Sequence, residues 1–478
     1  MKIAMVASEA NPLAKTGGLA DVVYALSKEL VHLGHEVVII MPFYRQMEGK
    51  IRTPLSPAAS YSFWMSWRHA YAEVFQTEIE GIHYYLIKND QYFGRDQIYG
   101  YNDDGERFAF FSMAARDLFK QIGFQPDIVH VHDWQSGILP LLIKQQNAGD
   151  PFFMKTRHVL TIHNPAFKGW LDPDALDNLF NLPISLYHDG WARFEDKVST
   201  LKCGIQFADK ITTVSPTHRN ELLTPEGSFG LDGVLRCREY DFCGFLNGID
   251  TSEFDPEKDH FLPLSYGAKD FEKGKEAARK LLLERCYLED HGGPMFGLVS
   301  RLSFQKGIHL IANVLPYYLE RGASFVCCGS GEYNLEQAFE DLRRRYPKQV
   351  GLYIGYSNER AHQVYAASDF FLMPSGFEPC GIGQMIAQRY GSIPVVRNTG
   401  GLADTIEPYR GYNEKESTGV MFNDYNDDGL SYAMSQAMGI YQDKKLFRQI
   451  QRNCIEKDNS WAKSAALYLG LYKSLTQA

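Results

Sequence analysis

The start of the chain places a short apolar strand, a glycine loop and a helix in immediate succession, and this order restricts the fold most. Residues Lys2–Ala7 predict a strand, and Lys15-Thr-Gly-Gly18 predicts a loop. Apolar residues then recur at helical spacing through Leu19–Leu30, and Gly34 is placed to end that helix. Glu36–Met41 is the next apolar strand. This βαβ order predicts a parallel sheet covered on both faces.

A second series of strands and helices begins near residue 295. Its predicted elements are a strand at Met295–Ser300, a helix at Gly307–Leu319, and strands at Ser324–Cys328, Gly351–Ile354, Phe370–Met373 and Ile393–Arg397. Asp127–Val131 and Val159–Ile162 are predicted as later strands of the first series. Two series of similar length predict an α/β fold of two doubly wound domains, and Asn247–Leu264 is the expected crossing. Ligands bind beyond the carboxyl ends of strands in open α/β sheets, so two facing sheets predict an interdomain cleft.

Composition and charge argue against several classes of function. The 478 residues are 45% hydrophobic and carry a formal net charge of −9, so a nucleic-acid partner is not expected. The eight cysteines form no CxxC pair, which argues against a disulfide scaffold or a structural zinc site. Met1–Gly18 lacks a secretory pattern, and no apolar run reaches the roughly 18 residues of a membrane span. We expect a reduced cytoplasmic protein with no membrane partner.

Two predicted strand-to-helix loops carry cations. Lys15 lies in the first, where glycines let a ligand approach the backbone and a helix N-terminus favours an anion. Arg301 and Lys306 lie in the second. Two such loops, one from each domain, would converge on one diphosphate and neutralise it in place of a metal ion. For each residue taken singly, a tight turn or a solvated side chain is the alternative.

Glu378 follows a predicted apolar strand and precedes a predicted helix, in Pro-Ser-Gly-Phe-Glu-Pro-Cys-Gly. A carboxylate at this place either accepts hydrogen bonds from sugar hydroxyls or caps the helix. The sequence Gly-Gly-Leu-Ala-Asp occurs at Gly17–Asp21 and again at Gly400–Asp404, so one loop of each domain carries the same glycine pair.

Three motifs suggest other chemistry and are rejected. Asp172-Pro-Asp174 has the carboxylate spacing of metal-dependent transferases, but no clear strand precedes it, and a turn or helix start is the better interpretation. Asp424–Gly429 begins like a calcium-binding loop, but Ser435 stands where the bidentate glutamate belongs. His132 and Asp133 suggest a catalytic pair, but neighbours on a strand point to opposite faces.

Taken together, these residues resemble the bacterial glycogen synthases and plant starch synthases over nearly the whole chain. The motifs that carry the resemblance are Lys15–Asp21, His132–Trp134, Thr161–Asn164, Thr213–Pro216, Leu246–Asp250, Ser300–Gly307 and Phe377–Gly381. The resemblance implies a fold of the GT-B type with two facing Rossmann-like domains. It implies an acceptor-side domain over residues 1–250, a nucleotide-sugar domain over 251–455, and a C-terminal helix in 456–478 that returns to the first domain.

The resemblance also implies a retaining hexosyltransferase that moves glucose from ADP-glucose, or UDP-glucose, to the end of glycogen or another α-1,4-glucan. No cofactor and no metal are implied. The catalytic residues by position are Lys15, His163, Arg301, Lys306 and Glu378. The substrate-binding residues by position are Gly18, Asp21, Asp133, Asn164, Asn247, Tyr356, Cys380 and Gly381, with Tyr356 stacking on the base.

The chain departs from the family pattern at four places. Gly376 stands where Arg is usual, Gly383 stands where Asn or Thr is usual, and Pro165 and Lys168 alter the segment after His163. Two alternatives stay open, and Gly376 and Gly383 motivate the first of them. One is a catalytically impaired glucan-binding regulatory protein. The other is a related two-domain enzyme, such as a phosphorylase, a disaccharide synthase or a transferase that uses UDP-glucose.

Overall fold

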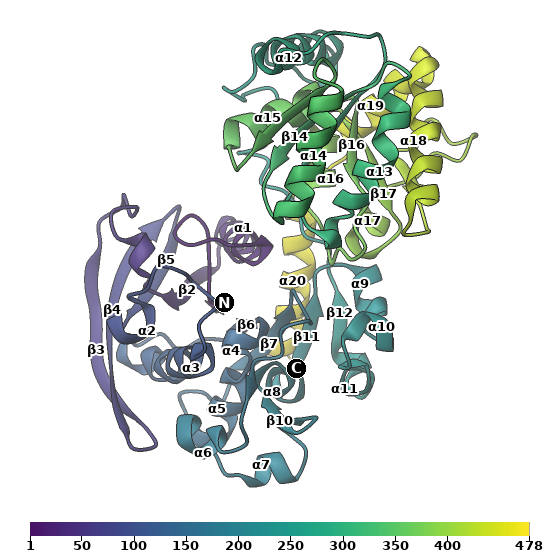
Figure 1. Ribbon diagram of the computed structural model, residues 1–478. Helices are drawn as coiled ribbons and strands as arrows, with labels where there is room; N and C mark the ends of the chain where they lie inside the picture. Colours follow the sequence, from purple (N-terminus) through teal and green to yellow (C-terminus); the bar gives the residue numbers. More distant parts are fainter. Residues whose placement is uncertain (478) are drawn as a thin grey trace. The chain divides into compact units, whose positions relative to one another are not determined.

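The first apolar segments of the chain lie in the middle of a nine-stranded sheet, with the order β12-β11-β7-β6-β1-β2-β5-β4-β3. The computed structural model describes residues 1–477, and this sheet belongs to unit 1, which holds residues 1–247 and the C-terminal helix α20 (Trp461–Thr476) (Figure 1). The strands are β1 (Lys2–Val6), β2 (Glu36–Pro42), β3 (Ser56–Met65), β4 (Arg68–Ile79), β5 (Ile82–Lys88), β6 (Ile128–His132), β7 (Arg157–Ile162), β11 (Lys210–Thr213) and β12 (Phe242–Gly244). β4 is antiparallel to both β3 and β5, and every other pair is parallel.

The helices of unit 1 surround this sheet, and α20 packs against α1. Their bounds are α1 (Gly18–His32), α2 (Asp90–Phe93), α3 (Asp104–Gln121), α4 (Asp133–Gly137), α5 (Leu139–Gln146), α6 (Ala175–Phe180), α7 (Ser185–His188), α8 (Thr200–Phe207), α9 (Pro216–Glu221), α10 (Pro225–Ser228) and α11 (Asp232–Arg236). A small sheet joins β8 (Trp170–Leu171), β10 (Lys197–Ser199) and β9 (Arg193–Phe194). Trp461 and Tyr472 of α20 are buried in the core of the unit, so the helix belongs to it although it is distant in sequence.

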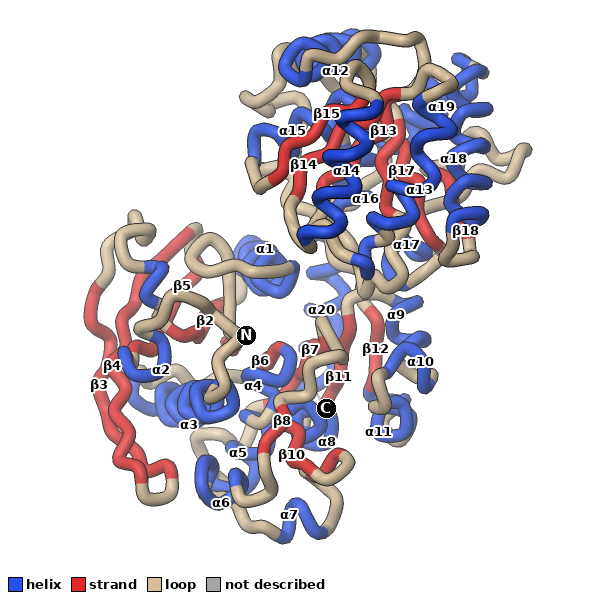
Figure 2. Tube along the Cα trace, in the orientation of Figure 1, coloured by secondary structure: helices blue, strands red, loops and turns tan. Residues whose placement is uncertain are grey.

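Unit 2 spans Gly248–Ser460 and contains a six-stranded parallel sheet with the order β15-β14-β13-β16-β17-β18 (Figure 2). The strands are β13 (Met295–Val299), β14 (Ser324–Gly329), β15 (Val350–Ile354), β16 (Phe370–Met373), β17 (Ile393–Arg397) and β18 (Val420–Phe422). The helices are α12 (Phe271–Cys286), α13 (Ile308–Leu319), α14 (Tyr333–Arg345), α15 (Asn358–Ala367), α16 (Gly383–Arg389), α17 (Gly400–Thr405), α18 (Asp427–Gln442) and α19 (Lys444–Glu456).

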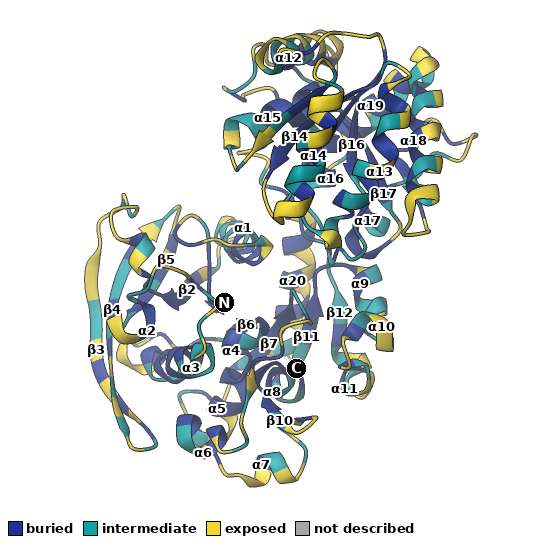
Figure 3. Cartoon of the chain, in the orientation of Figure 1, coloured by how far each residue is buried: buried dark blue, intermediate teal, exposed yellow. Residues whose placement is uncertain are grey.

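The predicted class of two doubly wound α/β domains is therefore confirmed. Most strands of both sheets are buried, whereas the edge strand β3 and its neighbour β4 are partly exposed, as are the outer sides of the helices (Figure 3). The loops that follow the carboxyl ends of β1, β6 and β7 carry the candidate residues of unit 1, and those that follow β13, β15 and β16 carry most of those of unit 2. The topology thus gathers the candidate residues at one end of each sheet. No helix within residues 1–477 is long and apolar enough to cross a membrane.

Candidate active site

In unit 1 the predicted anion loop ends at the N-terminus of α1. The N-cap is Gly17, which has no side chain to cap the helix, and a Cβ at Gly17 or Gly18 would meet only open space. The first amides of a helix attract anions, and these glycines leave them approachable. Nζ of Lys15 lies 2.7 Å from Oδ1 of Asp21 in the first turn of α1. The loop therefore presents a cation, and the same carboxylate also accepts from Asn11.

Sequence reasoning missed Glu9, whose side chain binds Thr16 in this loop. Its buried carboxylate accepts hydrogen bonds from the backbone N–H of Thr16 and, at 3.0 Å, from the Thr16 hydroxyl. Burial raises the pKa of Glu9 above its usual value. The only signal in the sequence was an acidic residue three positions after the end of a buried strand.

Asp133 connects two other candidate residues. It follows β6 and begins α4 with φ of +54°, and its carboxylate accepts from the backbone N–H of His163 at 2.7 Å and of Asn164 at 3.2 Å. Burial raises the pKa of Asp133 to about 7. The rejection of a His132–Asp133 pair assumed that both residues lie on a strand. The strand instead ends at His132, and the left-handed backbone at Asp133 turns its carboxylate toward the end of β7.

A row of buried histidines leads from the core to His163. Nδ1 of His132 lies 3.0 Å from Nε2 of His163, and the ring of His132 stacks on that of His130 at 4.3 Å. Nδ1 of His130 lies 2.7 Å from the hydroxyl of Tyr472 in α20. Burial lowers the pKa of both His130 and His163 to about 3, so neither imidazole is charged near neutral pH. Sequence reasoning missed His130 and Tyr472, because 342 residues separate them.

In unit 2 the loop after β13 meets the loop after β16. Nζ of Lys306 lies 2.5 Å from Oε2 of Glu378, and the Ser375 hydroxyl donates to the same oxygen at 3.0 Å. α16 begins at Gly383 with Ile382 as its N-cap, so the Glu378 carboxylate does not cap it. Arg301, in the same loop as Lys306, is exposed and makes no ion pair within residues 1–477.

Two glycines let the loop after β16 be approached closely, one by the loop after β13 and the other by the loop after β17. Gly307 has φ of +71°, and a Cβ there would lie 2.1 Å from the carbonyl oxygen of Pro374. Gly400 has φ of +43°, and a Cβ there would lie 2.0 Å from the carbonyl oxygen of Glu378. Cys380 is buried between these loops, and Gly381 follows it with φ of +71°.

The remaining predicted residues do not join these groups. Tyr356 follows β15 and is 77% exposed, with its hydroxyl 3.4 Å from Oδ1 of Asn358. Asn247 is buried at the end of the first segment of unit 1. The rejected acidic motifs have structural roles: Asp172 pairs with Lys197 at 2.5 Å, and Asn426 caps α18.

Comparison with known proteins identifies the family of the chain. The model described as "Starch synthase catalytic domain" matches residues 2–237, and "Glycosyl transferases group 1" matches residues 284–455. A glycogen synthase of Clostridium beijerinckii is 42% identical over 100% of this chain and 99% of its own length. A glycogen synthase of Streptococcus equi subsp. equi is 41% identical over 99% and 100%. The chain belongs to the glycogen and starch synthase family.

Solved structures support the same assignment. The catalytic domain of starch synthase IV from Arabidopsis thaliana, bound to ADP and acarbose, has a TM-score of 0.92 and 34% identity, with coverage of 100% of this chain and 99% of that one. A sucrose-phosphate synthase from Thermosynechococcus elongatus, at 16% identity and a TM-score of 0.62, shares the fold. The fold is of the GT-B type, and this member of the glycogen synthase family is a glycosyltransferase, as the sequence predicted.

Three of the four departures from the family pattern have local structural contacts that accompany them. A Cβ at Gly376, where the family usually has Arg, would lie 2.9 Å from the ring of Tyr425. Arg397 donates to the Gly376 carbonyl at 2.7 Å and lies 5.4 Å from that same ring. Lys168 is buried and donates to the Pro165 carbonyl at 2.6 Å, so these two unusual residues bind each other. For Gly383, whose Cβ would lie 3.3 Å from Sδ of Met373, nothing in the structure explains the change.

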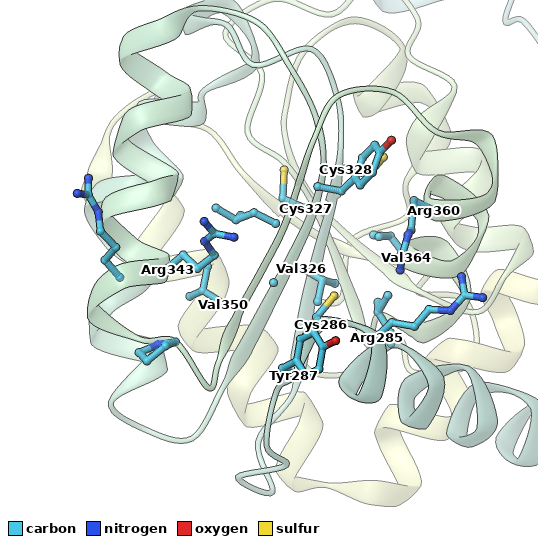
Figure 4. A pocket seen from close by; sticks show the side chains of 16 residues that line it. Arg285, Cys286, Tyr287, Val326, Cys327, Cys328, Arg343, Val350, Arg360 and Val364 are labelled. Carbon is cyan, nitrogen blue, oxygen red and sulfur yellow. The ribbon is translucent and has the colours of Figure 1, made fainter.

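A separate cavity of about 470 Å³ lies beside β14 and β15 in unit 2 (Figure 4). Arginines line it, among them Arg285 and Arg343, which pair with Glu359 at 2.5 Å and Glu340 at 2.6 Å. Its lining contains none of the predicted site residues, so we do not include it in the candidate active site.

Proposed function

We propose that this glycosyltransferase transfers glucose from ADP-glucose to the non-reducing 4-hydroxyl end of an α-1,4-glucan, with retention at the anomeric carbon and without a metal ion. The observation that carries the proposal is the Lys306–Glu378 pair at 2.5 Å, which puts a cation beside a hydroxyl-binding carboxylate at the carboxyl ends of two strands. Support for the nucleotide comes from the related starch synthase IV, which is bound to ADP.

In this proposal Lys15, Arg301 and Lys306 act together on the diphosphate of one donor. The C1–oxygen bond to the diphosphate breaks, and negative charge grows on the leaving phosphate oxygen. A unit charge about 4 Å from it contributes roughly 4 kcal/mol at an effective dielectric of 20, before desolvation. The amides near Gly18 at the N-terminus of α1 add further partial positive charge.

The groups around the glucose would bind it rather than react with it. Glu378, together with the backbone at Cys380 and Gly381, would accept and donate hydrogen bonds to glucose hydroxyls. His163 is neutral and would act as a hydrogen-bonding group beside the sugar, next to Asn164. Their backbone amides are held by Asp133, so that carboxylate would orient them.

The acceptor completes the reaction on the same face of the sugar. Its 4-hydroxyl oxygen bonds to C1, and its proton passes to the departing phosphate oxygen, so no covalent enzyme intermediate forms. A double-displacement mechanism needs two carboxyl groups about 5–5.5 Å apart. Glu378 is the only carboxylate that the proposal places at the glucose. Asp21 and Asn247 would lie toward the acceptor, and Tyr356 would stack on the base.

The direct test is incubation of the enzyme with glycogen and radiolabelled ADP-glucose or UDP-glucose. Incorporation of label into glycogen supports the transfer. Release of that label as maltose by β-amylase supports an α-1,4 linkage at the non-reducing end. Absence of incorporation from either donor, with retained binding to glycogen, would favour the glucan-binding regulatory alternative instead.

A further inference from the structure

A hairpin at one end of the nine-stranded sheet exposes large aromatic side chains. β3 and β4 are joined by the two residues Ser66 and Trp67, and β3 is the last strand of the sheet (Figure 1). Trp64 is 59% exposed, Trp67 72% and Tyr71 52%. A cluster of exposed apolar side chains of this kind marks an interaction site for a ligand or a partner.

Strand alternation separates a packed face of this hairpin from an open one. Tyr61 and Phe63 point inward, where the Tyr61 hydroxyl donates to the Ala114 carbonyl of α3 at 2.7 Å. Trp64 therefore points outward, and its cross-strand partner is His69, with ring centroids 4.7 Å apart. Tyr71 lies two residues farther along β4, roughly 7 Å away on the same face. Trp64, His69 and Tyr71 thus form a row of rings on the outer surface, and Trp67 lies in the turn at the end of that row, against the guanidinium of Arg68.

The turn that carries these rings is held in one conformation. The side chain of Asn181 donates to the Trp64 carbonyl at 2.7 Å and accepts from the Ser66 amide at 2.6 Å. Ser66 and Asn181 both have left-handed backbones, with φ of +53° and +54°. Arg68 donates to the Asn178 carbonyl at 2.9 Å, and its guanidinium lies 4.4 Å from the Trp67 ring. The backbone that carries the rings is thus held in one conformation before any ligand binds, which lowers the entropy cost of binding.

We infer that Trp64, Trp67 and Tyr71 form a glucan platform that holds an α-1,4-glucan chain away from the reacting residues. The inference rests on the proposed function, which makes such a polymer the acceptor. A pyranose ring has an apolar C–H face that stacks on an aromatic ring and a rim of hydroxyls that need polar partners. The platform offers both, because Ser62, opposite Tyr71, and His69 stand among its rings.

The size of the platform argues against a protein partner. An aromatic side chain buries about 150–250 Å², so three rings exposed by about six-tenths offer roughly 350 Å². A stable protein interface needs about 800 Å² from each partner. A glucan chain needs only successive rings in a row. The anchored polymer would keep its chain ends near the enzyme, which raises their effective concentration without any change in chemistry.

The test compares glucan binding with transfer in the Trp64→Ala/Trp67→Ala double variant. We expect the variant to lose retardation in native gels that contain glycogen, with a dissociation constant raised about 3- to 10-fold for each ring removed. KM for glycogen should rise, while kcat/KM for maltotriose, which is too short to span both sites, should stay within about two-fold. The variant Trp64→Ala/Trp67→Tyr, which keeps a ring at position 67, should show much more retardation than the double alanine variant.

The matched control is Trp191→Ala, which removes another half-exposed tryptophan of unit 1. It should leave both measurements unchanged. Unchanged retardation of the folded double variant would overturn the inference, as would a wild-type dimer that the double variant converts to monomer in light scattering. Failure of the wild type to transfer glucose at all would instead overturn the proposed function, because gel retardation does not depend on catalysis.

Discussion

In the proposed mechanism the charge of Lys306 acts on the donor diphosphate, and in the fold the same charge pairs with Glu378. Replacing Lys306 by Ala should lower kcat by about 10²–10³-fold, the range for a lost oxyanion donor, while the KM for the donor changes less. Because the mainly buried Glu378 carboxylate would lose its partner at 2.5 Å, Tm should also fall. Steady-state kinetics and thermal unfolding measure both effects.

Arg301 has an exposed side chain, so Arg301→Ala should lower kcat without lowering Tm. Near-normal kcat in either the Lys306 or the Arg301 variant would remove that residue from the mechanism.

Asp133 should make stability depend on pH in an unusual direction. Its pKa is about 7 in the folded chain against 3.8 for an ordinary carboxyl, so the folded state binds more protons between these values. Its contribution to stability is full below pH 3.8 and is lost as pH rises through 7. Asp133→Asn keeps an acceptor for the amides of His163 and Asn164 but cannot titrate. The unfolding free energy of Asp133→Asn minus that of the wild type should therefore increase as pH rises, by at most about 4 kcal/mol.

Urea unfolding at pH 5 and pH 8 measures this difference. The buried histidines lose stability in the opposite direction, as pH falls below 6.5, but they are present in both proteins and cancel in the comparison. The control is Asp174→Asn, at an exposed position. Equal pH dependence in wild type and Asp133→Asn would contradict the raised pKa.

The sequence identified candidate residues but not their partners. Lys306 and Glu378 each belong to a recognisable motif, yet the ion pair joins residues 72 positions apart and depends on two loops meeting. The role of Asp133 was hidden because nothing in His-Asp-Trp indicates a left-handed residue after the strand. Glu9 and His130 belong to no family motif quoted, and only the fold shows that they support the loop and the histidine row.

At the scale of elements, the turn before α13 depends on Gly307. Gly307→Ala would force an L residue into φ of +71° and push its Cβ against the Pro374 carbonyl, so the loop that carries Lys306 must move. We expect a lower Tm and a kcat reduced by at least about 10-fold, since small displacements of catalytic groups are costly. Gly439→Ala, inside α18 with open space around it, should leave kcat unchanged and raise Tm slightly. Wild-type kcat in Gly307→Ala would show that this turn does not set the site.

Element prediction succeeded for mainly apolar runs and missed strands that alternate with polar residues or are very short, among them the buried strands β11 and β18. Phe370–Met373 and Ile393–Arg397 are strands with the predicted bounds, because each is a continuous apolar run between loop residues. β3, β4 and β5 were not predicted. In β3 small and polar residues such as Ser60 and Ser62 alternate with Tyr61 and Phe63, a pattern that needs a known sheet edge before it can be placed.

At the scale of the whole molecule, the proposed chemistry makes divalent metal ions unnecessary. Lysine and arginine side chains supply the positive charge, and Asp172 of the Asp-Pro-Asp motif is paired with Lys197. Transfer to glycogen in excess EDTA should keep most of the activity measured with Mg²⁺. Loss of activity in EDTA that Mg²⁺ or Mn²⁺ restores would contradict the proposal. It would make Asp172 and Asp174 candidates for metal ligands again.

The choice of donor also belongs to the whole molecule, because base, diphosphate and glucose must be bound at once. We expect a higher kcat/KM with ADP-glucose than with UDP-glucose on the same glycogen. The related starch synthase IV is bound to ADP, and Tyr356 exposes a flat ring at the carboxyl end of β15. A purine covers more of such a ring than a pyrimidine does, and stacking of a base on an aromatic side chain contributes roughly 1–3 kcal/mol. Tyr356→Ala should therefore raise the KM for ADP-glucose more than that for UDP-glucose and narrow the preference, with little change in kcat. A higher kcat/KM for UDP-glucose in the wild type would reverse the assignment of the donor. It would not affect the assignment of the protein as a glucosyltransferase.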